Sequence, residues 1–164
     1  MVELRIEFLT ELFKQIDLKL GFQIQNCHIH TYFLYDLYLF VFHLAESTQI
    51  VMTVITRQLA KDLYESTLLD ICKQFPGLTH KLIIPGFKKD LGSTCISQFV
   101  IGTPDMLEKE IFKRNYIDLS NLKVFVLDEA QEIINIGGLT PTKKQMFKIK
   151  DAIPESCEIK IFNL

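Results

Sequence analysis

Two adjacent carboxylates, Asp128 and Glu129, follow directly after a short apolar run at residues 123–127. An apolar run of this length is typical of a strand that is buried on both faces of a parallel sheet. Ligands of such sheets gather just beyond the carboxyl ends of the strands. Carboxylates at that place can hold a hydrated Mg²⁺ ion and orient a water molecule, which is the chemistry of nucleoside triphosphate hydrolysis.

A phosphate-binding loop would have to accompany this chemistry, and the sequence contains none. Such a loop reads Gly-x-x-x-x-Gly-Lys-Ser/Thr, because backbone N–H groups and a lysine must surround the phosphates. No glycine in the chain is followed by lysine. The nearest imitation, residues 86–94, has one residue too many and lacks that lysine. We therefore expect this chain to be catalytically inert by itself.

Two other segments place polar side chains just after predicted strands. Residues 55–60 read Ile-Thr-Arg-Gln-Leu-Ala, and residues 101–104 read Ile-Gly-Thr-Pro. Thr103 can cap a helix whose first turn holds Pro104, where the missing N–H group of proline costs nothing. The carboxyl ends of parallel strands meet at one edge of a sheet. We therefore expect both segments to lie at the same edge as the two carboxylates.

Predicted strands and helices alternate along the chain. The first strand is rich in β-branched residues, and the first helix has apolar residues at helical spacing. Alternation of this kind implies an α/β fold in which helices cover both faces of a parallel sheet. Strands are expected at residues 49–55, 82–84, 98–101, 123–127 and 158–162, and helices at 3–20, 32–44, 58–75 and within 142–152.

Composition and charge are typical of one globular domain. The chain has 164 residues, of which 48% are hydrophobic and 23% charged, and its net charge is −2. This balance argues against a strongly basic nucleic-acid binder, although a local basic patch is compatible with it. Residues 30–45 are apolar but too few to span a membrane, and Asp36 interrupts them, so we expect a buried helix there.

The cysteines are scattered and form no Cys-x-x-Cys pair, so we expect reduced thiols, most of them buried, in an intracellular protein. Residues 27–30 read Cys-His-Ile-His and are the strongest metal-binding candidate. No second pair of ligands follows at the spacing of a zinc site, so we expect no metal there. The N-terminal residues show no secretory signal. The four cysteines are Cys27, Cys72, Cys95 and Cys157.

Taken together, the strand-end segments resemble the first RecA-like domain of DEAD-box RNA helicases. Residues 55–60 are similar to the family's Pro-Thr-Arg-Glu-Leu-Ala motif, with Ile55 in place of Pro and Gln58 in place of Glu. Pro85 and Gly86 stand at the family's Gly-Gly turn. Residues 103–104 open its Thr-Pro-Gly-Arg motif, and residues 128–131 correspond to Asp-Glu-Ala-Asp.

The resemblance covers roughly residues 53–162 and is strongest over residues 99–131. There the chain looks most like the branch of the family that acts in mRNA export at the nuclear pore. It implies a RecA-like parallel sheet with helices on both faces, in an incomplete form. We expect one partial domain over residues 1–164, with a divergent part at 1–48 and a motif-bearing core at 49–164.

The resemblance also implies roles for particular residues. Asp128 would hold Mg²⁺ through water and Glu129 would activate the attacking water, so that both serve the bound ATP. Five residues would lie along an RNA backbone path, which hydroxyl and backbone N–H groups contact without reading sequence. Some of the residues with implied roles have a structural alternative: Thr103 and Pro104 as a helix start, Arg57 as the partner of a nearby carboxylate, and Asp128 with Glu129 as the beginning of a loop. The five are Thr56, Arg57, Gly86, Thr103 and Pro104.

Several residues depart from the family pattern. Gln131 replaces the second Asp of the motif, and Asp105 brings negative charge next to the RNA path, where it is unfavourable. The imitation loop at 86–94 follows residues 55–60, whereas the family's loop precedes them. Asn163 and Leu164 stand where the family's Ser-Ala-Thr motif continues, and a second RecA-like domain is not among these residues.

Three interpretations remain open at this point. The chain is a truncated or degenerate first domain of an ATP-dependent RNA helicase, a non-catalytic RNA- or protein-binding module with the same fold, or the product of an incomplete gene prediction. By resemblance the partners are RNA and a nuclear-pore or mRNP protein, with no membrane and no DNA. By resemblance, too, the location is the nucleus, the nuclear pore and the cytoplasm. ATP and Mg²⁺ are implied by the family alone.

Overall fold

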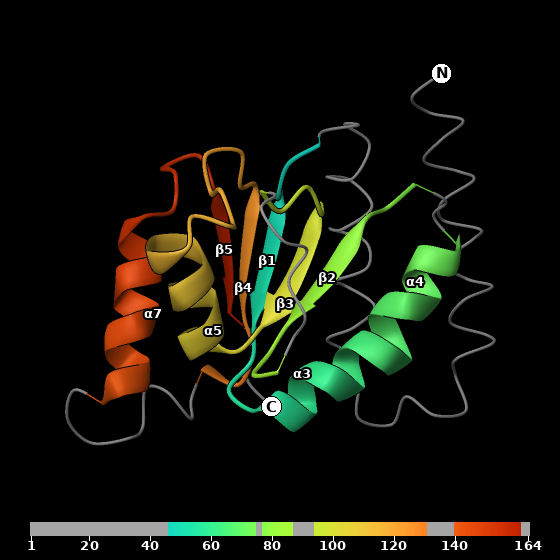
Figure 1. Ribbon diagram of the computed structural model, residues 1–164, viewed down its shortest axis with the longest axis horizontal. Helices are drawn as coiled ribbons and strands as arrows, with labels where there is room; N and C mark the ends of the chain where they lie inside the picture. Colours follow the sequence, from blue (N-terminus) through green and yellow to red (C-terminus); the bar gives the residue numbers. More distant parts are fainter. Residues whose placement is uncertain (1–45, 75–76, 87–93, 131–139, 162–164) are drawn as a thin grey trace. The chain divides into compact units, whose positions relative to one another are not determined.

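The computed structural model describes residues 46–74, 77–86, 94–130 and 140–161, which all lie in the compact unit Tyr38–Leu164 (Figure 1). Five parallel strands form one sheet in the order β2-β3-β1-β4-β5. The predicted parallel sheet is therefore confirmed, and each predicted strand is present with its ends shifted by a few residues. The strands are β1 (Ile50–Thr53), β2 (His80–Ile83), β3 (Phe99–Gly102), β4 (Val124–Leu127) and β5 (Glu158–Ile161).

Helices follow the strands and lie on both sides of the sheet. Helix α3 (Arg57–Leu63) continues through a π-helical turn, Tyr64–Leu68, into α4 (Leu69–Gln74). Helix α5 (Pro104–Glu108) likewise continues into a π-helical turn, Lys109–Lys113, and α7 spans Pro141–Asp151. Figure 1 shows α5 and α7 side by side on one side of the sheet, with α3 and α4 on the other.

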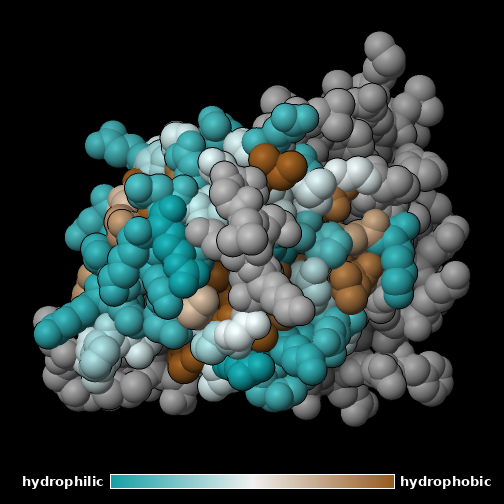
Figure 2. Space-filling model, in the orientation of Figure 1, coloured by the Kyte–Doolittle hydropathy of each residue, from teal (hydrophilic) through white to brown (hydrophobic). Residues whose placement is uncertain are grey.

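Alternating strand residues build the core between the sheet and helices α5 and α7. Val51, Val100 and Phe125 point to this side and pack with apolar residues of the two helices, such as Leu107 and Ile149. The outer surface of α5 and α7 is mainly hydrophilic (Figure 2), as expected for helices that bury one face only. The intervening strand residues are buried as well: Ile50, Met52, Phe99, Ile101, Val124 and Val126.

Strand β5 departs from this pattern at the edge of the sheet. Its side chains Ile159 and Ile161 are 45% and 56% exposed, whereas the residues of β1 and β3 are fully buried. An edge strand has a neighbouring strand on one side only, so its side chains have fewer neighbours to shield them from solvent. The prediction of a strand here is confirmed, but burial on both faces applies only to the inner strands.

Several expectations lie outside the described residues. These are the helices at 3–20 and 32–44, the candidate metal ligands at 27–30, and positions Gln131 and Phe162. In the described ranges no helix is long and apolar enough to cross a membrane, and no group of three or more metal-ligating side chains occurs. Of the described cysteines only Cys95 is buried. Cys72 and Cys157 are half-buried, so the expectation of mostly buried thiols is wrong there.

Candidate functional site

The ends of β1, β3 and β4 lie side by side at one edge of the sheet. Thr53, the last residue of β1, is in register with Gly102 of β3 and Leu127 of β4. Backbone hydrogen bonds extend this alignment past the strands, because Val54 N donates to Gly102 O (3.1 Å) and Asp128 N donates to Thr53 O (3.1 Å). The prediction that the three segments share one edge is confirmed.

The acidic corner, Asp128 and Glu129, begins where β4 ends. Asp128 is only 7% exposed, and its Oδ1 accepts a hydrogen bond from the backbone N–H of Glu129 at 3.0 Å. Burial raises the pKa of the Asp128 carboxyl, and the hydrogen bond from Glu129 offsets part of that rise. A carboxylate in this setting is poorly solvated, so a nearby cation would stabilise its charged form.

Glu129 has a backbone conformation that is uncommon for its residue type. Its φ is 50°, in the left-handed region that favours glycine, and the same is true of Asn115 at φ 49°. A residue other than glycine is held there only when the surrounding structure compensates for the strain, and such residues cluster at functional sites. This strained residue directly follows the buried carboxylate of Asp128. Its position supports a functional interpretation of the acidic corner.

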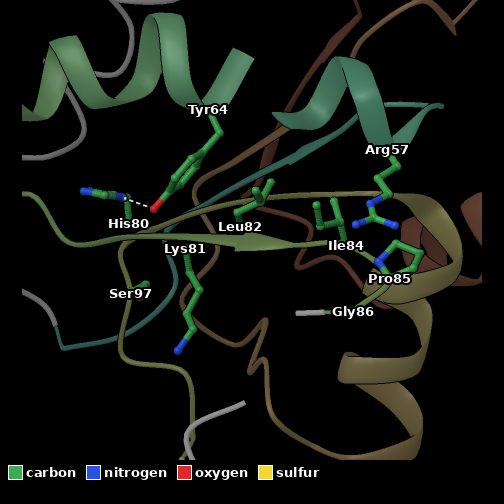
Figure 3. A pocket seen from close by; sticks show the side chains of 9 residues that line it. All are labelled: Arg57, Tyr64, His80, Lys81, Leu82, Ile84, Pro85, Gly86 and Ser97. Carbon is green, nitrogen blue, oxygen red and sulfur yellow. Dashed lines mark hydrogen bonds between the residues drawn. The ribbon is translucent and has the colours of Figure 1, made fainter. Parts of the chain in front are cut away.

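Thr56 and Arg57 start helix α3 just beyond β1. Thr56 is the N-cap residue, and its Oγ1 accepts a hydrogen bond from the backbone N–H of Leu59 at 3.1 Å. Its hydroxyl therefore stabilises the start of the helix, a structural role that the motif did not indicate. The Arg57 side chain is exposed, and its guanidinium extends toward the turn after β2 (Figure 3).

Gly86 occupies that turn, opposite Arg57. Its φ is +86°, a conformation that side chains other than glycine's strongly disfavour. A Cβ built on Gly86 would lie 4.0 Å from Nη2 of Arg57, so the bare backbone of the turn faces the guanidinium. Of the predicted RNA-contacting residues, the structure brings Arg57 and Gly86 together at the surface.

Thr103 and Pro104 occupy a different environment. Thr103 is 3% exposed and Pro104 is buried as well. Thr103 is the N-cap residue of α5, as predicted, but its side chain makes no capping hydrogen bond, and its Oγ1 has no partner among the described residues. Both side chains are thus withdrawn from the surface, which favours their structural role. Their contact with RNA stays a prediction.

Gly102 is a structurally important residue. It lies within the segment 101–104, but the motifs predicted no role for it. A Cβ at this position would lie 2.5 Å from the carbonyl oxygen of Ile83 and 3.1 Å from Cδ2 of Leu107. Only a residue without a side chain lets β2, β3 and α5 approach so closely. Its position at the end of β3 was visible in the sequence, but its neighbours were not.

A basic pocket of about 370 Å³ extends from Arg57 and Gly86 along the outer edge of β2 (Figure 3). Its polar lining includes four residues that no motif marked. They belong to three segments, 64, 80–81 and 97, so no local pattern could have found them. The four are Tyr64, His80, Lys81 and Ser97, and apolar lining comes from Leu82, Ile84 and Pro85.

The sequence of this chain matches a known protein family. A family model described as DEAD/DEAH box helicase matches residues 29–162, which is more than half of the chain. The chain belongs to the DEAD/DEAH box helicase family. The resemblance drawn from the strand-end motifs is confirmed.

Curated DEAD-box relatives match part of their length. The ATP-dependent RNA helicase DBP5 of Lodderomyces elongisporus is 28% identical over 108 residues, which are 66% of this chain and 20% of the relative. The ATP-dependent RNA helicase DDX25 of Bos taurus is 38% identical over 80 residues, 49% of this chain and 16% of the relative. The chain thus spans about a fifth of the length of the curated relatives it matches.

Solved structures of a DEAD-box protein share the fold. Saccharomyces cerevisiae Dbp5 bound to RNA and ADP BeF3 has a TM-score of 0.69 and 23% identity, over 81% of this chain and 32% of that one. A Dbp5 variant bound to Nup159, Gle1, IP6 and ADP has a TM-score of 0.63 and 25% identity, over 73% and 30% of the two chains. These likenesses confirm the RecA-like α/β fold.

The family implies that ATP and Mg²⁺ are bound. The acidic corner has ligands for Mg²⁺ but none for the phosphates of ATP. Asp128 and Glu129 offer oxygen ligands of the kind that a hydrated Mg²⁺ ion accepts, and the poor solvation of Asp128 favours a cation beside it. The phosphates of ATP need a lysine and a cradle of backbone N–H groups, and no Gly-Lys pair exists in the chain to supply them. The residues present therefore fit the metal ion and do not fit the triphosphate.

Proposed function

We propose that this chain is a DEAD-box domain that binds single-stranded RNA through Arg57 and Gly86 and does not hydrolyse ATP by itself. The observation that carries the proposal is the exposed guanidinium of Arg57 facing the bare backbone turn at Gly86. Arg57 follows β1 and Gly86 follows β2, two parallel strands with β3 between them, and ligands of open α/β sheets bind beyond such strand ends.

The chemistry of these two groups suits an RNA backbone. A guanidinium presents several N–H donors in a planar fork that matches the oxygens of a phosphate. A glycine turn adds backbone N–H groups that a side chain would otherwise obstruct. Contacts of this type hold the sugar–phosphate backbone and carry no sequence information, so the proposed binding is independent of base sequence.

We infer the lack of ATP turnover from the groups that the chain offers to Mg²⁺ and to the phosphates. When bound, Mg²⁺ supplies charge stabilisation for phosphoryl transfer, and Asp128 and Glu129 would hold it through water. Orientation of the γ-phosphate requires the lysine and the N–H cradle that the sequence lacks. Two carboxylates alone repel the phosphates. The acidic corner is then a remnant of the family's catalytic site in this chain.

Two measurements on the purified chain test the proposal. Fluorescence anisotropy with a labelled single-stranded RNA should show binding that weakens with salt. Arg57→Ala should raise the Kd roughly tenfold, the effect of losing one charge-assisted hydrogen bond. Lys150→Gln on α7, an exposed position, is the control and should leave the Kd unchanged. Equal effects of the two substitutions would count against Arg57 as an RNA contact.

Calorimetric titration with Mg²⁺-ADP and Mg²⁺-ATP tests the second part of the proposal, that the chain does not hydrolyse ATP by itself. We expect no heat of binding at millimolar nucleotide from folded protein. Micromolar binding that Asp128→Ala abolishes, or sustained hydrolysis that Glu129→Gln abolishes, would overturn the proposal that the chain is inert. RNA binding and ATP hydrolysis are measured separately, so one half can fail without the other.

Location and protein partners are proposed from the family relationship alone. A Dbp5 variant was solved with Nup159 and Gle1, and this supports mRNA export at the nuclear pore as the setting of the present chain. Co-purification of tagged full-length chain with Nup159 or Gle1 tests the partner. A chain that retains RNA binding but neither partner would act outside that setting.

A further inference from the structure

Strand β5 forms the end of the sheet opposite β2. In the described ranges it pairs only with β4, so no described strand lies along its outer edge. An edge strand presents a row of backbone N–H and C=O groups with which a strand of another chain can pair. Neither Arg57 nor Gly86 belongs to β5, so what binds this edge is independent of the proposed RNA contact.

Two isoleucines of β5 are exposed although they point toward the helices. Ile159 is in register with Phe125, which is buried in the core between the sheet and helices α5 and α7. Residues in register on neighbouring strands lie on the same side of a sheet, and so do alternate residues of one strand. Ile159 and Ile161 therefore lie on the side of α5 and α7, and these helices leave about half of each residue uncovered.

Apolar exposure is concentrated at this end of the sheet. Phe147, which is 57% exposed, belongs to α7, and Figure 1 shows this helix at the β5 end. The remaining large hydrophobic residue that is exposed in the described ranges is Ile96, whose carbonyl accepts a hydrogen bond from Thr79 next to β2. Single exposed apolar residues are ordinary, whereas a group of them indicates a contact surface.

The charged residues of β5 make the strand complementary to a second copy of itself. Glu158 and Lys160 lie on the opposite side of the strand from the isoleucines, with Oε1 and Nζ 3.4 Å apart. When two copies of β5 pair antiparallel about Ile159, Glu158 of each copy stands opposite Lys160 of the other. Opposite charges directly across a strand pair are favourable. Each charge keeps its partner within its own strand and gains another across the interface.

The same charges select the register of the pairing. Pairing about Lys160 would set two ammonium groups opposite each other, and pairing about Glu158 would do the same with two carboxylates. Like charges directly across a strand pair are destabilising. Pairing about Ile159 avoids both contacts and sets the two Ile159 side chains opposite each other. Such an interface uses the same surface of both copies, which is the commonest arrangement of homodimers.

We propose that β5 pairs antiparallel with β5 of a second copy of this chain, centred on Ile159, so that the two five-stranded sheets join into one. A strand of four residues makes a small interface. The dimer should therefore be weak, with a Kd of roughly 10–100 µM.

A strand from elsewhere in the same chain is the competing occupant of this edge. It would cover the same isoleucines but leave the protein monomeric at every concentration. The charge pattern favours a second copy, because the match between Glu158 and Lys160 arises when the strand meets its own sequence.

Sedimentation velocity of the full chain, over roughly 1–500 µM, measures the dimer Kd. Glu158→Lys and Lys160→Glu should each raise this Kd roughly tenfold or more, because each sets like charges across the interface. In an equimolar mixture of the two variants every cross-strand pair is again of opposite charge. The mixture should therefore associate more tightly than either variant alone, which a contact within one chain cannot cause.

A matched pair of apolar substitutions gives a second readout. Ile159→Asn should raise the Kd more than tenfold, because it removes the central apolar pair. The control Ile96→Asn changes the same residue type at a 59% exposed position and should leave the Kd unchanged. Circular dichroism checks that each variant is folded.

Three outcomes would overturn the pairing. The first is a wild-type chain that stays monomeric at the highest concentration, which would assign the edge to a strand of the same chain. The second is a dimer that neither the charge variants nor their mixture alters, and the third is equal behaviour of Ile159→Asn and Ile96→Asn. RNA binding through Arg57 is measured separately, so the proposed function stands or fails independently of these results.

Discussion

The acidic corner and the basic pocket lie at the same sheet but are built in opposite ways. The acidic corner consists of two consecutive residues, Asp128 and Glu129, with a buried carboxylate and a strained backbone. The basic pocket takes its polar side chains from several distant segments, and Arg57 and Gly86 at one end of it are exposed. Strands β1 and β3 separate the two in the strand order. The comparison shows that one sheet carries a site made of consecutive residues and a pocket that depends on packing between distant segments.

The difference has a physical cause. The buried carboxylate of the acidic corner needs a positive charge nearby to offset its poor solvation. A complete nucleotide site would add the lysine of a phosphate loop, and the chain has no such loop. Arg57 in the basic pocket needs no such complement, because its side chain is exposed to solvent. We therefore expect the two regions to contribute to stability with opposite pH dependence and to have separate effects on ligands.

Gly102→Ala should have the largest effect, because it disturbs both regions together. A Cβ would lie 2.5 Å from the carbonyl oxygen of Ile83 and push β2 away from β3. We expect a loss of about 1–3 kcal/mol in the free energy of unfolding, as for other overpacked sites, measured by urea denaturation. The exposed substitution Glu155→Ala should stay within about 0.5 kcal/mol of the wild-type chain. A Gly102→Ala variant of wild-type stability would show that the strands can separate freely.

Two threonines that are the N-cap residues of α3 and α5 sharpen the comparison further. Thr56→Ala removes the capping bond to Leu59 and should cost about 1 kcal/mol of stability. Thr103→Val replaces a buried hydroxyl that makes no capping bond with a methyl group of similar size, so it should be neutral or slightly stabilising. Thermal unfolding of both variants distinguishes them, and equal losses would contradict the assignment.

Asp128→Asn should stabilise the protein at neutral pH, by less than about 1 kcal/mol. Burial raises the pKa of Asp128, so the folded state binds its proton more tightly than the unfolded state does. Its contribution to stability is therefore greatest at acidic pH and is lost as the pH rises through the folded-state pKa. The variant should not show that loss when its urea midpoint is followed against pH.

Asp118→Asn provides a control of opposite sign for this pH dependence. Hydrogen bonds from the backbone and hydroxyl of Ser120 lower the pKa of Asp118. Its stabilising contribution is therefore present above the ordinary pKa and is lost as the pH falls through the lowered value. The Asn variant should be less stable than wild type at neutral pH. Shifts of the same sign in both variants would contradict the burial of Asp128.

Acidification should produce the smallest effect, through His80. Burial lowers its pKa below the ordinary 6.5, so the unfolded state binds the proton first as the pH falls. Stability should decrease slightly from pH 6.5 down through the folded-state pKa, and His80→Gln should remove that component. A pH profile that the substitution leaves unchanged would show that the His80 ring is well solvated in the folded protein.

Local patterns predicted much of the fold. Apolar runs with turn residues between them located all five strands, and the polar residues that follow β1, β3 and β4 were correctly placed at one edge. Exact strand ends shifted, as for β2, which begins at His80 instead of Leu82. Strand order, the exposure of Ile159 and Ile161, and the burial of Thr103 depend on neighbours far away in the chain, so no local pattern could show them.

The sequence by itself determined the family, the parallel sheet, the paired carboxylates and the absence of a Gly-Lys phosphate loop, because each is a property of consecutive residues. Tertiary structure alone decided which motif residues reach the surface. In the folded chain Thr103 and Pro104 are buried, and the hydroxyl of Thr56 caps a helix. Arg57 lies opposite Gly86. Tertiary structure also assembled the basic pocket from separate segments. Burial and convergence depend on packing between distant residues, and spacing along the chain does not encode either directly.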